Sequence, residues 1–408
     1  MALSKLWVIA WRDLARNRRR SFFSLLAVGL GLALLILLNG YITGVVEDAL
    51  QISIQLETSH LQLRAASYED EKVSLQWKDL LENPEALAAE AAAIDEVEVA
   101  APVLWASGVL NTRDDSVGLQ MYGIDTTSAL YAPFQETMVA GEFLTPDDRS
   151  GILIGKRLAD SLGIKAGDNV NLVVVNADGE ADESVFAVRG LFSTGIFKYD
   201  DAAALMPLSK AQAFTGADGR ASAIAMLLHN QDDADTVAAR FQNPDVATLT
   251  WEDLNAIFLQ TMDTAMSFYI IMYFIVILIV AVIIANTLLM SVYERFREMG
   301  IMAALGMKGR QIMLMFLFEA TLLGLAGIVV GIALGSLGVY YIATTGIPIG
   351  DMGSAAGDIP IGSTLYGKFN PSGMVWLSFW TLLITLLASL YPAWFASRLQ
   401  PVEALHSS

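Results

Sequence analysis

Four long apolar stretches decide most of what this chain can fold into. Residues 21–46, 264–293 and 372–395 carry no charged side chain, and residues 312–343 carry only Glu319. A hydrocarbon core about 30 Å thick is crossed by roughly 20 helical residues, so each stretch is long enough to span a membrane. Helices satisfy all their backbone polar groups internally, as a membrane requires. We therefore expect an α-helical membrane protein with four transmembrane helices, over residues 21–47, 265–293, 312–343 and 372–395.

Composition supports this class and excludes several kinds of site. Of the 408 residues, 54% are hydrophobic and 17% are charged, whereas soluble globular chains carry about 25% charged residues. The chain has no cysteine, which excludes disulfides, thiolate metal sites and cysteine nucleophiles. The three histidines, His60, His229 and His406, are too scattered to predict a metal site. We expect no metal and no cofactor.

The region between the first two spans, residues 48–264, has the pattern of a large α+β domain. Residues 94–123 contain short apolar runs broken by polar pairs, which predict strands and hairpins. Residues 153–175 predict a helix that ends at Gly163, a turn at Gly167 and Asp168, and a strand. Further strands are expected over residues 185–191, 223–228 and 246–250, with a helix over residues 233–241. A region of this length can bury a core of its own.

The negative charge of the chain belongs to this domain. Residues 49–265 hold 34 acidic and 13 basic residues, while the rest of the chain holds 9 acidic and 12 basic residues. Nucleic-acid binding requires the opposite sign, so we exclude it.

The first twenty residues combine basic and apolar side chains. Trp7, Trp11 and nearby aliphatic residues can form an apolar helical face, and an arginine cluster follows. Residues 1–20 therefore predict an amphipathic helix at the membrane surface, with the clustered arginines at the lipid headgroups. These surface-anchor residues are Arg16, Arg18, Arg19 and Arg20. A cleaved signal peptide is the competing interpretation, but the apolar run that follows is longer than a typical signal core, so we expect an uncleaved span.

The basic residues of the short segments set the orientation. Six precede the first span, four lie between the second and third, and one follows the fourth, which is 11 of the 12 basic residues outside the middle region. With four spans all of these segments lie on one side, and the excess of Lys and Arg makes that side cytoplasmic. Both termini, including the tail of residues 396–408, are expected in the cytoplasm. The α+β domain and the Gly/Pro-rich loop of residues 344–371 are expected outside, in the periplasm if the membrane is a bacterial inner membrane.

A charged connector, residues 294–311, joins the second and third spans. It contains Glu294, Arg295, Arg297 and Glu298, and Arg310 follows further along. In a helix Glu294 can pair with Arg297, and Arg295 with Glu298, one turn apart. Glycines such as Gly306 predict that this helix ends near Leu305. A solvated loop and a docking site for a partner are both compatible with this pattern.

Two features inside the third span leave alternatives open. Gly327, Gly331 and Gly335 repeat at four-residue spacing, which lets helix backbones approach closely, either within the chain or between subunits. Glu319 is compatible with a proton relay or with a helix-packing acid near the membrane boundary.

The sequence contains no motif that indicates a catalytic site. The string from Gly151 to Arg157 is one residue short of a phosphate-binding loop and has no Ser or Thr after Lys156. No Ser/His/Asp set stands out. We expect a protein that is not an enzyme and whose motor is another polypeptide.

Several strings resemble one family. ERFREMGIMAALGMKGRQI, residues 294–312, resembles the cytoplasmic signature of the FtsX/MacB/LolC-LolE superfamily of ABC transporter permeases. YPAWFASR, residues 391–398, running on to residue 405, is similar to the closing motif of that family. LIGKRLADSLGIKAGDNVNL and VRGLFSTGIFKYDDAAALMPL, residues 153–172 and 188–208, look most like the lipoprotein-releasing LolC/LolE branch.

The resemblance implies a type VII ABC exporter permease. Two permease copies, identical or different, would pair, and each would bind a separate cytoplasmic ATPase similar to LolD or to the MacB nucleotide-binding domain, which would bind the ATP. The connector would be the coupling helix, with its ATPase contacts at Glu294, Arg295, Arg297, Glu298, Gly306 and Arg310. A periplasmic lipoprotein carrier is a further implied partner. The loop of residues 346–371 is longer than this branch leads us to expect, and no carrier-binding hook loop is identifiable.

The function that follows is that of a permease subunit. It would couple ATP hydrolysis by its partner to extraction of a lipoprotein or lipid-like substrate from the inner membrane. The alternatives are a MacB-like mechanotransmission efflux permease, an FtsX-like transmembrane regulator of a cell-wall hydrolase, and a membrane-anchored sensor or adhesion protein that has no ATPase partner.

Overall fold

The computed structural model describes residues 3–16, 18–69, 73–112, 115–241, 243–349 and 362–398. Its contacts divide the chain into two compact units. One, here called the helical unit, comprises Met1–Val46, Asp263–Ile347 and Tyr366–Ser408; the other, here called the strand-rich unit, comprises Glu47–Met262 and Pro348–Leu365. Most of the tail of residues 396–408 and the centre of the loop of residues 344–371 lie outside the described residues.

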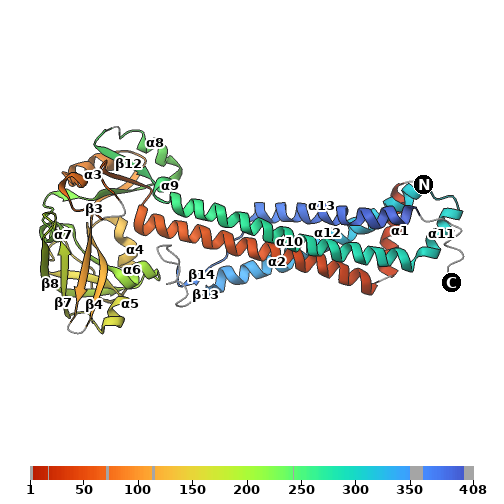
Figure 1. Ribbon diagram of the computed structural model, residues 1–408, viewed down its shortest axis with the longest axis horizontal. Coiled ribbons are helices and arrows are strands. Elements are labelled where there is room, and N and C mark those ends of the chain that lie inside the picture. The colour runs from red at the N-terminus through yellow and green to blue at the C-terminus, as the bar shows by residue number, and fades with distance from the viewer. Residues whose placement is uncertain are drawn as a thin grey trace. The chain divides into compact units, whose positions relative to one another are not determined.

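The helical unit contains four helices that are long and apolar enough to cross a membrane, as the sequence predicts. In the described part of the chain they are α2 (Arg18–Ser53), α10 (Ala256–Glu294), α12 (Gly309–Thr345) and α13 (Pro371–Ser397), and they run side by side (Figure 1). Two shorter helices, α1 (Leu3–Arg16) and α11 (Phe296–Ala304), accompany them. The larger part of the strand-rich unit, Glu47–Met262, lies in sequence between the first and second spans, and its remainder, Pro348–Leu365, lies between the third and fourth. The chain is thus a four-span α-helical membrane protein with a large α+β domain inserted after its first span.

The basic N-terminal segment differs from the single helix expected over residues 1–20. Helix α1 ends at Arg16, and α2 begins at Arg18, so the last three arginines of the cluster belong to the first spanning helix. The reason is the packing of α1: Ala10 is fully buried, and the rings of Trp7 and Phe318 of α12 meet edge to face at 5.6 Å. Helix α1 thus lies against α12, whereas α2 is one of the helices long and apolar enough to cross a membrane.

Helices α2 and α12 pack through the glycine repeat of the third span. A Cβ atom added to Gly331 would lie 2.8 Å from the Cβ of Leu32 and 2.9 Å from the carbonyl oxygen of Gly29. Gly327 and Gly335 are equally close to Val28 and Ile36 on the same helix. The small residues at four-residue spacing therefore serve close packing within this chain.

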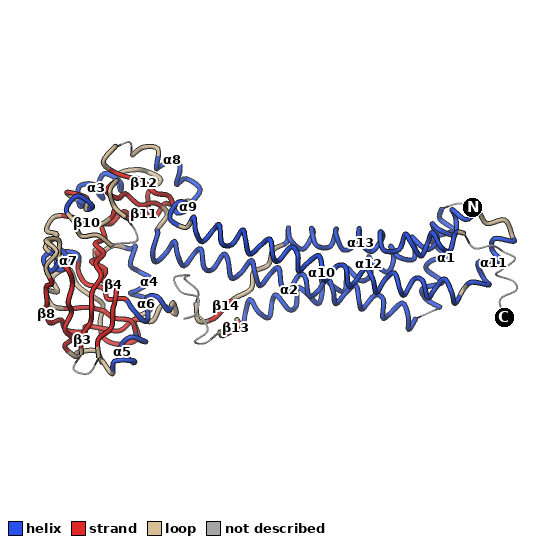
Figure 2. Tube along the Cα trace, in the orientation of Figure 1, coloured by secondary structure: helices blue, strands red, loops and turns tan. Residues whose placement is uncertain are grey.

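The strand-rich unit is built on a ten-stranded sheet, in the order β12-β1-β11-β3-β4-β9-β6-β8-β5 with β7 paired to β3 and β8. Figure 2 shows the strands of this unit in red. The strands are β1 (Leu61–Ala65), β3 (Val97–Asn111), β4 (Ser116–Ile124), β5 (Met138–Gly141), β6 (Gly151–Gly155), β7 (Asn169–Val175), β8 (Ala181–Phe192), β9 (Ala203–Pro207), β11 (Ala223–Leu228) and β12 (Val246–Thr250). Two-residue pairs join β2 (Leu81–Glu82) to β10 (Arg220–Ala221) and β13 (Ile347–Pro348) to β14 (Thr364–Leu365).

Short helices complete this unit: α3 (Pro84–Ala92), α4 (Ala132–Glu136), α5 (Lys156–Leu162), α6 (Phe197–Ala202), α7 (Leu208–Thr215), α8 (Ala234–Ala238) and α9 (Trp251–Leu254). The predicted strands over residues 185–191, 223–228 and 246–250 are confirmed. So is the helix ending at Gly163, whose φ of +66° is the left-handed conformation that glycine adopts without strain. The helix expected over residues 233–241 is shorter, because α8 ends at Ala238.

A buried hydrogen-bonded joint holds together the two ends of the strand-rich unit that continue into α2 and α10. Ser53 Oγ donates to Asn255 Oδ1 at 2.7 Å, and Asn255 Nδ2 donates to Thr58 Oγ1 at 3.3 Å. All three side chains are buried, so water cannot reach their polar groups. The hydrogen bonds between them supply the missing partners. The joint fixes the π-helical turn Ile54–Thr58 to the start of α10.

The close packing of α2 and α12 predicts that Gly331→Val lowers the stability of the helical unit. The added methyl groups would overlap Leu32 and the backbone of α2, which costs about 1–3 kcal/mol. The matched control is Ala333→Val, which adds two methyl groups to an exposed position on the same helix. Thermal unfolding of the full chain in detergent measures both. Equal melting temperatures for the two variants would contradict this packing.

Candidate partner-binding site at the connector

The connector is a short helix held between two spans. Helix α11 ends at Ala304, next to Leu305, where its end was predicted. The chain then turns through Gly306, whose φ of +91° is a conformation that other residues adopt only with strain. Helix α12 begins at Gly309. The connector is therefore a folded element and not an extended loop.

One face of α11 packs against the helical unit. Met299 is 1% exposed, and Met302 and Ala303 pack beside it. The buried cluster that receives this face contains Val292, Met299, Ile312, Met315, Phe316, Ala393 and Ala396, from α10, α11, α12 and α13. The inner face of the connector is thus part of the core of the helical unit.

A buried arginine fixes the start of α11. The Arg295 side chain is 5% exposed, and its Nη2 donates to Asp13 Oδ2 of α1 at 2.5 Å. Its Nη1 lies 3.5 Å from Glu319 Oε2 of α12, and its Nε donates to Glu298 Oε2 at 3.2 Å. One guanidinium therefore binds carboxylates from α1, α11 and α12, using the fork of donors that arginine offers.

Two further arginines extend these ion pairs. Arg20 of α2 donates to Glu294 Oε2 at 3.0 Å and to Glu319 Oε1 at 3.2 Å. Arg16 of α1 donates to both oxygens of Glu298, at 2.6 and 2.8 Å. We call the whole set the charge cluster; it consists of Asp13, Arg16, Arg20, Glu294, Arg295, Glu298 and Glu319.

The charge cluster shifts the pKa values of Arg295 and Glu298 in the direction that keeps these two groups charged. Burial opposes the charged form of Arg295, but the neighbouring Asp13 and Glu319 outweigh it and raise the pKa of the guanidinium. Burial likewise opposes ionisation of Glu298, but hydrogen bonds from Arg295 and Arg16 outweigh it and lower the pKa of that carboxyl. Arg295 and Glu298 therefore stay ionised at neutral pH, and both tie the connector to the bundle.

The residues predicted to contact a partner divide into two groups. Glu294, Arg295 and Glu298 point into the charge cluster, whereas Arg297 and Arg310 are exposed. The predicted pair of Arg295 and Glu298 is present, and Glu294 contacts Arg20. Gly306 lies at the turn that ends α11.

The surface-anchor residues also divide. Arg16 and Arg20 bind the carboxylates of the charge cluster, whereas the anchor hypothesis directs them to lipid headgroups. Arg18 and Arg19 are exposed at the start of α2. The ion pairs that Glu319 makes with Arg20 and Arg295 support the helix-packing interpretation of this acid. Asp13 was missed, although it is the only acidic residue among the first 46 and lies within a basic segment.

The outer face of the connector carries an exposed patch. Arg297 and Ile301 lie four residues apart on α11, and Leu305 follows at its end. Ile301 is 46% exposed and Leu305 is 83% exposed. Together with Arg310 beyond the turn, these residues form what we call the connector patch. Large apolar side chains exposed beside cations are typical of a protein-binding surface.

The described residues do not assemble a metal site. Among them no group of three or more His, Asp or Glu side chains could hold a metal ion. In the string that approximates a phosphate-binding loop, a Cβ atom on Gly155 would lie 2.2 Å from the carbonyl oxygen of Asp200. The backbone at this glycine is packed against protein and not open to a phosphate.

Two family models match the chain. The MacB-like periplasmic core domain matches residues 21–243, and the FtsX-like permease C-terminal domain matches residues 270–401, which include the connector. The first model covers more than half of the chain.

Relatives extend the similarity to the full length. The chain is 23% identical to the lipoprotein-releasing system transmembrane protein LolC of Neisseria meningitidis serogroup B, over 97% of this chain and 98% of that protein. It is 24% identical to LolE of Haemophilus influenzae, over 94% of each chain. The crystal structure of the periplasmic region of MacB from Actinobacillus actinomycetemcomitans is 13% identical, covers 51% of this chain and 97% of that structure, and superposes with a TM-score of 0.36.

The burial of Arg295 predicts that Arg295→Met is strongly destabilising. It leaves buried carboxylates without their main cation, a change that costs about 3–5 kcal/mol in a buried ion pair. Replacing both partners, as Arg295→Met with Glu319→Leu, removes one uncompensated charge and should cost less than the sum of the single changes. Thermal unfolding of the two single variants and the double variant measures this coupling. Strict additivity would contradict a direct interaction.

Proposed function

The chain belongs to the family of proteins with a MacB-like periplasmic core domain, followed here by an FtsX-like permease domain, and from this premise we propose how it works. It is a permease subunit of an ABC transporter. We propose that it couples ATP hydrolysis by a separate ATPase to the extraction of a lipoprotein, or another lipid-like substrate, from the inner membrane. The similarity to LolC and LolE over nearly the whole chain supports this substrate class.

The observation that carries the proposal is the two-sided connector. Its outer face presents the connector patch to a partner, and its inner face is bound to α1, α2 and α12 through the charge cluster. A force applied to the patch is therefore passed to several helices at once. In the proposal, an ATPase similar to LolD binds this patch and supplies that force.

The proposal also assigns sides of the membrane and partners. The excess of basic residues in the short segments supports a cytoplasmic connector and cytoplasmic termini, with the strand-rich unit in the periplasm. A second permease copy completes the transporter. A periplasmic carrier for the released lipoprotein is a further expected partner, and the permease itself performs no chemistry.

A second candidate follows from the MacB-like core. In it the strand-rich unit drives an efflux assembly mechanically, and no substrate passes between the spans. The family match over residues 21–243 supports this candidate, while the full-length similarity to LolC and LolE favours lipoprotein release. Crosslinking from α2 to the acyl chains of a lipoprotein during ATP hydrolysis distinguishes them, because only the release function brings the acyl chains there.

Reversing charge and polarity on the connector patch should uncouple the motor. We expect the double variant Arg297→Glu with Leu305→Glu to bind the cognate ATPase at least about tenfold more weakly, since it replaces a cation and a central apolar contact. Stimulated ATP hydrolysis should fall in parallel. Co-purification and ATPase assays of the assembled complex measure both.

The matched control reverses an exposed charge elsewhere, as Lys165→Glu in the strand-rich unit. It should leave binding and stimulated hydrolysis unchanged. If the connector double variant also keeps wild-type binding and stimulation while remaining folded, the patch is not the motor site.

A further inference from the structure

The loop between the third and fourth spans is longer than the LolC/LolE branch leads us to expect, and motor coupling gives it no role. Its described residues include 362–370, which we call the strap. The strap contacts the rest of the chain at two places. One contact belongs to the strand-rich unit and the other to the helical unit, because the division between the units falls between Leu365 and Tyr366.

The first contact is with the turn of residues 193–196. Ser363 N donates to the carbonyl oxygen of Gly195 at 2.9 Å, and Gly362 forms an antiparallel bridge with Ile196. Ile196 is buried and belongs to an apolar core cluster of the strand-rich unit. The strap is therefore bound to a residue that is itself fixed by packing.

A buried carboxylate holds this turn in shape. Asp200 of α6 accepts hydrogen bonds from the amides of Thr194 and Gly195, at 2.8 and 3.0 Å. Gly195 has a φ of +76°, which glycine adopts without strain. The carbonyl group that receives the strap is thus held by the backbone on both sides.

The second contact is with α2. A Cβ atom added to Gly44 would lie 2.1 Å from the carbonyl oxygen of Tyr366 and 2.8 Å from the Cα of Gly367. Lys368 N donates to the carbonyl oxygen of Gly40 at 2.9 Å. Because the atoms near Gly44 belong to the backbone, no change of rotamer could make room for a side chain there. The two glycines let the strap lie directly on the helix.

The end of the strap is fixed as well. Asn370 Nδ2 donates to Thr43 Oγ1 of α2 at 3.3 Å, and Asn370 Oδ1 accepts from Gly373 N at 2.9 Å. The second bond caps the start of α13. The strap thus passes from α2 into a spanning helix through a hydrogen-bonded residue.

Little free chain separates the two contacts. Thr364 and Leu365 join them, and these residues form β14, which pairs with β13. Ile349 N also donates to the carbonyl oxygen of Ser363 at 3.0 Å. The strap therefore cannot lengthen between its contacts without breaking hydrogen bonds.

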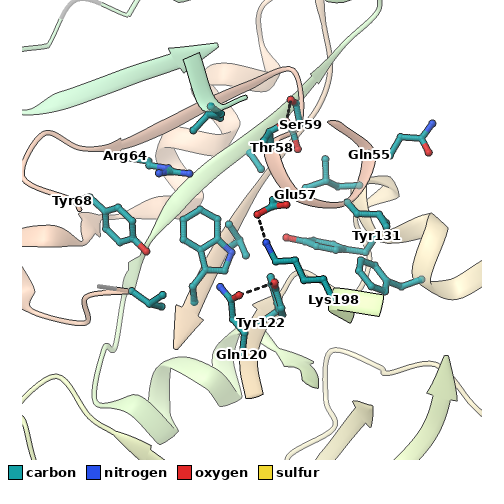
Figure 3. Close-up of a pocket in the computed structure, with 18 of the residues that line it drawn as sticks. Gln55, Glu57, Thr58, Ser59, Arg64, Tyr68, Gln120, Tyr122, Tyr131 and Lys198 are labelled. Atoms are coloured by element: carbon teal, nitrogen blue, oxygen red, sulfur yellow. Dashed lines mark hydrogen bonds and ion pairs between the residues drawn. The ribbon is translucent and has the colours of Figure 1, made fainter. Parts of the chain in front are cut away.

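Helix α6, which follows the turn, binds the continuation of α2. Lys198 forms an ion pair with Glu57 (Figure 3), and the Tyr199 hydroxyl donates to the carbonyl oxygen of Leu56 at 3.0 Å. Leu56 and Glu57 lie in the π-helical turn that directly follows α2. The strap and α6 thus hold one continuous stretch of helix at two places, at Gly44 and at Glu57. A bend of the helix between these places must strain one of the two contacts.

We propose that the strap couples α2 to the turn of residues 193–196. A displacement of α2 at Gly44 is passed along the strap and reaches the turn through Ser363. The strap is a conformational device built into the fold, and its action does not depend on how the motor binds the connector.

The experiment measures hydrogen exchange of single amides in the full chain, in phosphatidylcholine nanodiscs without ATPase or ATP. Electron-transfer fragmentation of the deuterated peptides resolves individual amides. In Gly44→Val the added side chain displaces Tyr366 and releases the Lys368 amide. We expect the Ser363 amide, in the other contact, to exchange about tenfold faster too, because its hydrogen bond to Gly195 is lost.

An insertion tests whether the chain of the strap carries this effect. Gly-Ser-Gly placed between Leu365 and Tyr366 lengthens the strap between its contacts. In this background Gly44→Val should still release the Lys368 amide, while the Ser363 amide should exchange as it does in the insertion variant alone. A general loss of structure would not be reversed by the insertion, so the comparison separates coupling from misfolding.

The matched control is Gly118→Val. Gly118 lies in β4, and an added Cβ atom there meets no atom of the described residues within 4 Å. Both the Ser363 and the Lys368 amides should exchange in this variant as they do in the wild type.

Three results would overturn the inference. They are wild-type exchange of both amides in Gly44→Val, wild-type exchange of the Ser363 amide when the Lys368 amide is released, and a fast Ser363 amide that the insertion does not restore. Each leaves the connector's role intact, because the ATPase is absent from this experiment. Conversely, a failure of the connector variants to uncouple the motor would leave the exchange of the strap unaffected.

Discussion

The fold of the connector depends on the burial of one guanidinium. Arg295 is almost completely removed from solvent, and a buried cation is tolerated only when carboxylates compensate the lost hydration. Asp13, Glu298 and Glu319 do so from three different helices. Arg295, which lies between the second and third spans, therefore binds the connector to the helical bundle through ion pairs. A segment that could have been a free loop becomes part of the bundle.

In the proposed function, the connector binds a partner although it is part of the helical bundle and not a separate domain. Its outer face is available because the inner face is already bound, by Met299 in the apolar core and by Arg16 and Arg20 in the charge cluster. Helix α2 is continuous from Arg18 to Ser53, and Ser53 is joined to Asn255 at the start of α10. Helix α2 thus takes part both in the charge cluster, through Arg20, and in the buried joint, through Ser53.

Much of this architecture could be predicted from the sequence, for local reasons. The spans follow from apolar length, and the strands at residues 223–228 and 246–250 follow from short apolar runs between turn residues. The end of α11 follows from Gly306, since a positive φ favours glycine. Each of these signals is carried by residues close together in the chain.

The contacts that matter most to the site are not local. Arg295 and Asp13 are 282 positions apart, and Arg20 and Glu319 are 299 positions apart, so no periodic pattern reveals that they meet. The same holds for a pocket of the strand-rich unit, whose wall includes Arg64, Trp105 and Lys198 from three separate segments. The division of the N-terminal segment into α1 and α2 also depends on α12, against which α1 packs. In all three cases tertiary packing decides what sequence periodicity leaves open.

The central claim is that the connector moves together with the helical bundle. The chain has no cysteine, so two introduced cysteines can be crosslinked specifically to test it. Replacing the ion pair, as Arg16→Cys with Glu298→Cys, and joining the two thiols with a short bis-maleimide links α11 covalently to α1. ATP hydrolysis by the assembled complex is then compared with and without the crosslink. The account predicts that the crosslinked complex keeps its stimulated hydrolysis, because the two helices already move together. Loss of stimulation in the crosslinked complex, with full stimulation in the uncrosslinked variant, would show that the connector must move relative to the bundle and would contradict the account.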